Sequence, residues 1–176
     1  MHRRGLALLT AALLAGGCGA GSTPPQPSAA PGLKVSSPAF TEGAPIPAQF
    51  TCAGPGDRPP IAWSGATTRA WAIVVDDPEA PGGDFFHWVV VDLPPGTTGV
   101  AGALPAMAHE IKNSGGRTAW TPPCPPSGTH HYRFTVYGLA APTGLSEDAS
   151  LDDALATLQK VSVIQGRLTG LVTHSG

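Results

Sequence analysis

The chain has 176 residues, enough for one ordinary domain with its own hydrophobic core. Charged residues make up only 12% of it, while Gly and Pro number 23 and 20, a composition that favours many short strands joined by turns. The formal net charge is −2, and no cluster of Lys and Arg follows position 4. Proteins that hold DNA or RNA by phosphate contacts need a basic face, so the sequence argues against a nucleic-acid partner.

Residues 1–17 are typical of a signal peptide. Arg3 and Arg4 precede an apolar run, residues 5–15, that is too short to span a bilayer as an ordinary helix. Small residues flank Cys18, as they do where bacterial lipoproteins are lipidated and cleaved. We therefore expect Cys18 to carry fatty-acyl chains such as palmitate, which would anchor the protein on the extracytoplasmic side of the cell membrane. The alternative is ordinary signal-peptidase cleavage near Ala20.

Residues 18–32 are predicted to form a tether. After Cys18 this segment holds mainly Gly, Ser, Thr, Pro, Gln and Ala, without apolar periodicity. Such a composition buries too little surface to offset the entropy lost on ordering, so we expect the tether to be disordered. The rest of the chain, residues 33–176, is predicted to be a single domain.

The domain is predicted to be all-β with minor α content. Strands are expected where apolar residues alternate with polar ones or form short runs between turns, at 33–37, 46–51, 69–76, 85–93 and 130–139. The strands at 69–76 and 85–93 are strongly apolar and should lie in the core sheet. A helix is predicted near residues 150–160, because Ser150 can cap it and three Leu side chains recur at helical spacing.

Ionisable residues stand at the ends of these apolar strands, where side chains commonly reach the mouth of a pocket. Asp77 follows the first strand, His87 begins the second, and His130 and Tyr132 begin the third. Since His130 and Tyr132 are two residues apart on one strand, they should project to the same face. A His beside a carboxylate has its cation favoured, so it can donate a charge-assisted hydrogen bond to a phosphate or carboxylate oxygen.

Two segments, residues 76–94 and 123–139, together resemble the phosphatidylethanolamine-binding protein family, in particular its bacterial members similar to the Raf kinase inhibitor proteins. The first contains Asp-Pro-Glu-Ala-Pro and then His-Trp-Val-Val, and the second contains Pro-Cys-Pro-Pro-Ser-Gly followed by a strand that begins with His130. The sequence departs from the family pattern at Pro122, where Gly is usual, and at His131, where Arg is usual.

The resemblance implies an antiparallel Greek-key β-sandwich with a peripheral C-terminal helix. It makes the Ala80–Pro81 bond a candidate cis peptide. It also implies a ligand-binding site, whose expected residues are Asp77, His87, His130 and Tyr132, with Phe85, Pro125 and Pro126 as its wall.

Cys52 and Cys124 are the two Cys residues that follow the leader, and both lie in loops that match the family pattern. An oxidising compartment permits a disulfide, so we expect them to form one. The alternative is a pair of buried free thiols.

The leading functional hypothesis is a non-catalytic binding protein with a pocket for a small anion, such as phosphate or a phospholipid headgroup, and with no cofactor or metal. The second is an inhibitor or regulator of a partner protein, such as an envelope protease or a kinase, because relatives in the family are linked to such roles. The third is an enzyme. No metal-ligand spacing and no nucleophile motif supports it, so we expect no catalysis.

Overall fold

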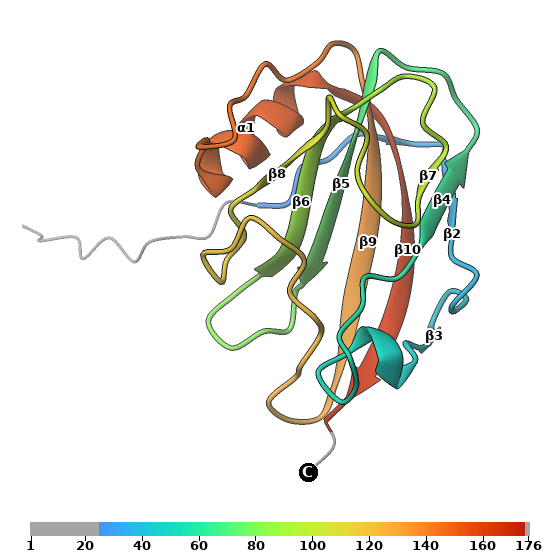
Figure 1. Cartoon of the computed structure of the whole chain (residues 1–176), viewed down its shortest axis with the longest axis vertical. Helices are drawn as coiled ribbons and strands as arrows, with labels where there is room; N and C mark the ends of the chain where they lie inside the picture. The colour runs from blue at the N-terminus through green and yellow to red at the C-terminus, as the bar shows by residue number, and fades with distance from the viewer. Residues whose placement is uncertain (1–24, 175–176) are drawn as a thin grey trace, which may run out of the picture.

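The computed structural model describes residues 25–174, so the predicted signal peptide, Cys18 and the first part of the predicted tether lie outside the described residues. Two β-sheets and one α-helix make up the domain (Figure 1). The elements are β1 (Ala30–Pro31), β2 (Lys34–Ser36), β3 (Ala44–Pro45), the 3-10 helix η1 (Ala48–Phe50), β4 (Ile61–Ser64), β5 (Ala70–Asp77), β6 (Phe85–Leu93), β7 (Gly99–Val100), β8 (His109–Ile111), β9 (Thr129–Leu139), α1 (Leu151–Val161) and β10 (Ser162–Thr173).

The larger sheet has the strand order β1-β10-β9-β5-β6-β8, with β3 also paired to β10, and the smaller sheet has the order β2-β4-β7. The long strands β5, β6, β9 and β10 are antiparallel neighbours. The two-residue pairings of β1 and β3 with β10 are parallel, which corrects the expectation of a wholly antiparallel structure. A mostly-β domain is confirmed, whereas the Greek-key connection of the strands stays a prediction.

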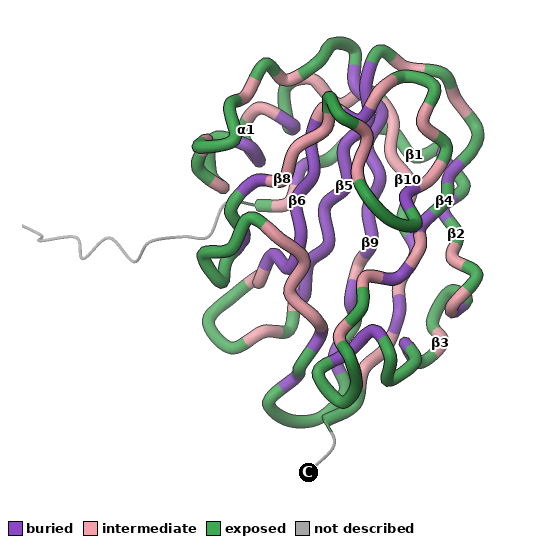
Figure 2. The backbone as a smooth tube through the Cα atoms, viewed as in Figure 1, coloured by how far each residue is buried: buried purple, intermediate pink, exposed green. Residues whose placement is uncertain are grey.

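The larger sheet is covered on both faces, which explains why its central strands are apolar throughout. Every residue of β5 is buried, as are most residues of β6 and β9 (Figure 2). One face packs against the smaller sheet through side chains such as Ile73 and Trp63, and the other packs against Leu155 and Leu158 of α1. The helix begins as predicted, because the Ser150 hydroxyl accepts a hydrogen bond from the Asp153 amide at 3.0 Å.

Two local predictions are wrong. The expected strand at 46–51 is instead a short extended segment followed by η1, because Pro45 and Pro47 have no N–H to donate to a regular ladder. The Ala80–Pro81 bond is not cis, since the peptide bonds of residues 25–174 are all trans. Gly82 and Gly83, which have φ of 94° and 119°, turn this loop without it.

The segment 25–32, expected to belong to the tether, packs against the larger sheet. The side-chain amide of Gln26 donates to Asp76 Oδ1 at 2.7 Å, and the Tyr137 hydroxyl donates to the carbonyl of Pro27 at 2.7 Å. These contacts use amide and carbonyl groups rather than apolar side chains, so they could not be predicted from hydrophobic periodicity. The structured part of the chain therefore includes residues 25–32.

Asp76 is fully buried beneath this segment, and Arg133 donates to its carboxylate through two nitrogens. Burial raises the pKa of Asp76 to about 6, although the Arg133 guanidinium opposes the rise. Because this pKa is higher in the folded protein than in the unfolded chain, the folded state takes up the proton first as the pH falls. As the pH falls from about 6 towards the ordinary pKa of an Asp, protonation of Asp76 should therefore stabilise the fold.

We expect the free energy of unfolding of the wild type, relative to an Asp76→Asn variant, to rise by about 1 kcal/mol between pH 7 and pH 5. The Asn side chain cannot titrate, so the difference between the two proteins isolates Asp76 from the other ionisable groups. Urea unfolding of both proteins at the two pH values measures it. Parallel pH dependences would show that the pKa of Asp76 is not raised.

Candidate functional site

A cavity of about 220 Å³ lies at the end of the larger sheet where β5 stops and where β6 and β9 begin. It is lined by Asp77, Ala80, Pro81, Phe85, His87, Thr121, Pro122, Cys124, Pro126 and Tyr132. Five of the seven residues expected at the ligand-binding site are among them: Asp77, Phe85, His87, Pro126 and Tyr132. The loops before β6 and before β9 supply the rest of the wall.

His87 reaches this cavity because of an irregularity in β6. In the pairing of β5 with β6, Val75 lies opposite Trp88 and Asp76 lies opposite Phe86, so His87 is an extra residue in a β-bulge. In a regular strand His87 and Trp88 would point to opposite faces. Because of the bulge, the two side chains can face the same side of the sheet. His87 lines the cavity, and Trp88 packs between the two sheets.

One ring nitrogen of His87 is already engaged by the protein. Nδ1 lies 2.9 Å from the carbonyl oxygen of Thr121, which can only accept, so Nδ1 carries a hydrogen and donates it. Within residues 25–174 Nε2 has no hydrogen-bond partner, so it is the nitrogen left for a ligand. Burial lowers the pKa of His87, while the Thr121 carbonyl and the Asp77 carboxylate oppose this effect. The unliganded imidazole is therefore neutral at pH 7, and an anion beside it would favour protonation.

Aromatic rings hold His87 in place. Its ring centroid lies 4.7 Å from that of Phe85 and 5.2 Å from that of Tyr132, which meets it edge-on at 77°. Burial and the nearby Asp77 carboxylate raise the pKa of Tyr132 well above its usual range. The phenol therefore keeps its proton at any physiological pH and can serve as a hydrogen-bond donor.

His130 is not among the residues that line this cavity, and its predicted contact with a ligand stays a prediction. Its Nδ1 lies 2.7 Å from Asp77 Oδ2, and the side chains of both residues are buried, with 9% and 4% of their surface exposed. The other oxygen of Asp77 accepts the Glu79 amide at 2.9 Å. His130 thus fixes the carboxylate of Asp77, and it acts on the cavity through that residue.

The remaining wall residue, Pro125, also lies outside this cavity and lines a neighbouring one. The loop that carries it is fastened by the predicted disulfide, which the structure contains between Cys52 and Cys124. The Cys52 amide also donates to the carbonyl of Pro123 at 3.0 Å. The Pro-rich loop is therefore joined to the segment near η1 by both a covalent bond and a hydrogen bond.

Asn113 supports the site and was not singled out from the sequence. Its buried amide nitrogen lies 2.9 Å from Thr121 Oγ1 and 3.1 Å from the carbonyl of His87, and it donates to both. Its oxygen accepts the amides of Gly115 and Arg117, which closes the turn before the Thr121 loop. An Asn two residues before Gly is a turn signal in the sequence. The signal does not reveal that Asn113 also bonds to Thr121, the hydrogen-bond partner of His87.

Neither a metal centre nor a membrane span is evident in the described part of the chain. Among residues 25–174, no group of three or more His, Cys, Asp and Glu side chains is placed to hold a metal ion. No helix in this range is long and apolar enough to cross a bilayer.

The fold and the cavity define a mostly-β domain with a small, proline-walled hollow at one end of its larger sheet. The chain belongs to the phosphatidylethanolamine-binding protein family, because the model of the family described as "Phosphatidylethanolamine-binding protein" matches residues 36–173. This confirms the family that the sequence motifs indicated.

Relatives and solved structures agree with this assignment. The chain is 41% identical over 194 aligned positions to the "Putative lipoprotein LppC" of Mycobacterium tuberculosis, covering 97% of this chain and 96% of the relative. It is 33% identical to a "UPF0098 protein" of Methanothermobacter thermautotrophicus, covering 79% and 97%. The crystal structure of E. coli YbcL, described as a new member of the mammalian PEBP family, superposes with a TM-score of 0.76 at 25% identity and covers 81% of this chain and 99% of YbcL.

Proposed function

We propose that this protein binds a small phosphate-bearing ligand, such as a phospholipid headgroup, in the cavity beside His87 and does not transform it. The observation that carries the proposal is the edge-on contact of the His87 ring, whose Nε2 has no hydrogen-bond partner among residues 25–174, with Tyr132, whose hydroxyl keeps its proton. Both groups can donate to an oxyanion, His87 once it is protonated. The carboxylate of Asp77, on the same wall, suits the ammonium end of a zwitterionic headgroup.

The proposed binding is linked to a proton. The unliganded His87 is neutral because burial lowers its pKa, and a bound anion would raise that pKa again. Ligand affinity should therefore increase as the pH falls. The increase should stop at the pH where His87 is already protonated in the unliganded protein. Glycerophosphoethanolamine is the suitable probe, because its phosphodiester keeps one charge across this pH range and any pH dependence belongs to the protein.

We expect glycerophosphoethanolamine to bind several-fold more tightly at pH 6 than at pH 8, as measured by NMR titration of the His87 and Tyr132 resonances. A His87→Gln variant should lose this pH dependence and about 1.5 to 3 kcal/mol of binding free energy, the value of one charge-assisted hydrogen bond. A His131→Gln variant is the matched control, because His131 is exposed on β9 and lies outside the cavity. Shifts confined to residues away from the cavity would reject the site, and turnover in esterase or phosphatase assays would reject the non-catalytic role.

The proposed cellular setting is the extracytoplasmic face of the membrane, with the domain anchored through lipidated Cys18. The leader motif supports it, and a relative that matches 97% of the chain has a lipoprotein name. We expect the wild type to incorporate a clickable palmitate analogue in the source bacterium and a Cys18→Ala variant to incorporate none. A Cys52→Ser/Cys124→Ser variant should be labelled like the wild type, which separates lipidation from a general effect of lost thiols. Labelling that survives in Cys18→Ala would contradict the anchor.

A further inference from the structure

The Pro-rich loop, residues 122–127, has few hydrogen-bond donors with which to hold its own position. Four of its six residues are Pro, and a Pro has no backbone N–H to donate. The loop therefore depends on donors elsewhere that its carbonyl groups accept. The Cys52 amide donates to the carbonyl of Pro123 at 3.0 Å, and Nδ1 of His174 donates to the carbonyl of Pro125 at 3.0 Å.

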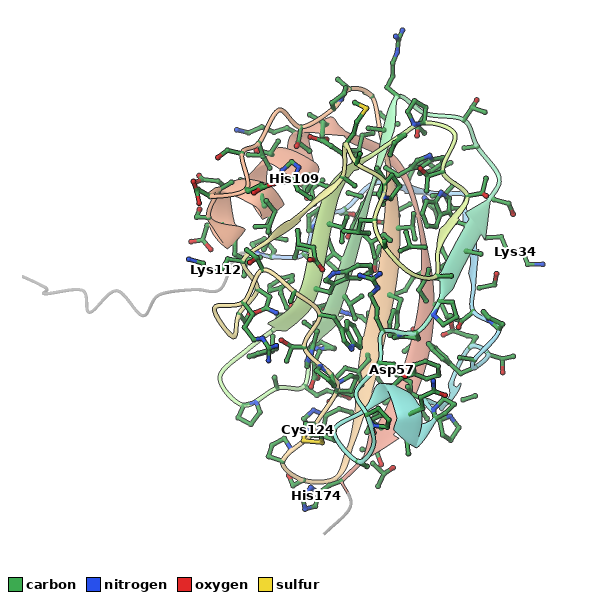
Figure 3. The ribbon with its side chains drawn as sticks, in the orientation of Figure 1. Lys34, Asp57, His109, Lys112, Cys124 and His174 are labelled. Atoms are coloured by element: carbon green, nitrogen blue, oxygen red, sulfur yellow. A yellow bond between two sulfur atoms is a disulfide. The ribbon has the colours of Figure 1, made fainter. Side chains whose placement is uncertain are left out.

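The covalent fastening of this loop is the Cys52–Cys124 disulfide, which joins it to the segment 51–57 that follows η1. Figure 3 shows Cys124 beside the yellow sulfur–sulfur bond, at the same end of the molecule as His174. The loop and the segment also pack closely at Gly56, where an added Cβ would lie only 2.6 Å from Cγ of Pro122. The disulfide thus holds together two surfaces that fit each other.

The same loop forms part of the wall of the candidate site. Pro122, Cys124 and Pro126 line the cavity beside His87. Cys124, Pro125 and Pro126 line a second cavity, of about 380 Å³. Because Cys124 belongs to both linings, breaking its bond to the segment 51–57 changes a wall of the candidate site directly.

The disulfide is open to attack by another thiol, because Cys52 and Cys124 are both exposed. A thiolate of a dithiol protein attacks one of the two sulfurs, which forms a mixed disulfide and releases the other Cys as a thiolate. The second thiol of the same protein then displaces the remaining Cys. Two electrons and two protons pass to the bridge, which becomes two Cys thiols, and the dithiol becomes a disulfide.

We infer that the Cys52–Cys124 disulfide is a redox switch of the candidate site. The oxidised bridge holds the Pro-rich loop in the position that binds ligand, and reduction by a dithiol releases the loop and weakens binding. The inference rests on the proposed function and names the regulation of the same site. The contact of His87 with Thr121, and that of Thr121 with Asn113, do not involve the bridge. Reduction therefore loosens a wall of the site and leaves this imidazole in place, so binding should weaken rather than disappear.

NMR titration with glycerophosphoethanolamine compares the oxidised wild type with the wild type reduced by dithiothreitol. The reduced protein should bind about tenfold more weakly, a coupling of ordinary size between two sites. A Cys52→Ser/Cys124→Ser variant is the matched control, and it should bind like the reduced wild type whether or not reductant is present. Because coupling is reciprocal, saturating glycerophosphoethanolamine should shift the equilibrium of the disulfide with a glutathione buffer by the same factor, or about 30 mV.

Hydrogen exchange follows the loop without any ligand. The Cys52 and His174 amides donate to carbonyls of Pro123 and Gly128, so their protection reports whether the loop is attached. Reduction should speed exchange at both amides, while the amides of β5 stay protected.

Equal affinity of the oxidised and reduced wild type would overturn the inference and leave the proposed function standing. Unchanged exchange at the two amides would also overturn it. Loss of protection in β5 would overturn it as well, because the bridge would then hold the whole fold rather than the loop. If glycerophosphoethanolamine binds neither form, the proposed function fails, and the exchange of the two amides alone decides whether reduction releases the loop.

Discussion

Replacing both Cys52 and Cys124 by Ser should lower the free energy of unfolding by about 4 kcal/mol. The bridge joins residues 72 positions apart, so its removal returns a large amount of conformational freedom to the unfolded chain. The loss is large compared with the total stability of a domain of this size. It should also loosen the loop that forms part of the wall of both cavities.

Denaturant unfolding of the wild type and the double Ser variant, each with and without reductant, tests this prediction. Both sulfur-bearing residues are exposed, so a reducing agent can reach the bridge in the folded protein. Reductant should bring the wild type to the stability of the variant and leave the variant unchanged. Equal unfolding midpoints for the oxidised wild type and the variant would contradict the role of the bridge in stability.

The elements that could be predicted from the sequence are those that depend on apolar pattern and local capping. The apolar runs at 69–76 and 85–93 became β5 and β6 because a strand covered on both faces needs no polar side chains. The helix could be predicted because Ser150 caps it and its Leu residues share one face. Both signals are contained within a few neighbouring residues.

Features that depend on contacts between distant residues could not be predicted this way. Alternation correctly places His130 and Tyr132 on one face of β9, but it cannot show that His130 is hydrogen-bonded to Asp77, which lines the cavity. The bulge that turns His87 towards the cavity arises from the pairing of β5 with β6. Similarly, Gln26 lies in a segment without apolar periodicity, and its contact with the buried Asp76 spans 50 positions.

The order of residues in the family motifs therefore identified most of the cavity, while their individual roles required the structure. Pro125 and Pro126 are adjacent in the sequence, yet only Pro126 lines the cavity beside His87. The adjacent residues His130 and His131 also differ in their surroundings. His130 forms a buried pair with Asp77, and His131 forms an exposed pair with Glu79.

These two neighbouring pairs should differ strongly in their contribution to stability. Asp77→Ala leaves the buried imidazole of His130 without its hydrogen-bond partner, and we expect a loss of about 1 to 3 kcal/mol in the free energy of unfolding. Glu79→Ala is the matched control, because the side chains of His131 and Glu79 are 52% and 42% exposed. An exposed pair typically contributes less than about 1 kcal/mol.

Urea unfolding at pH 7 compares the two variants, and a His130→Ala variant with its Asp77→Ala double completes the cycle. The double variant should be less destabilised than the sum of the two single variants, because neither partner is then left buried without the other. Asp77→Ala should also weaken ligand binding more than Glu79→Ala does. Asp77→Ala removes a cavity-lining carboxylate and so weakens glycerophosphoethanolamine binding, whereas Glu79→Ala changes only an exposed pair beside the cavity. Equal destabilisation by Asp77→Ala and Glu79→Ala would show that burial does not distinguish the two pairs.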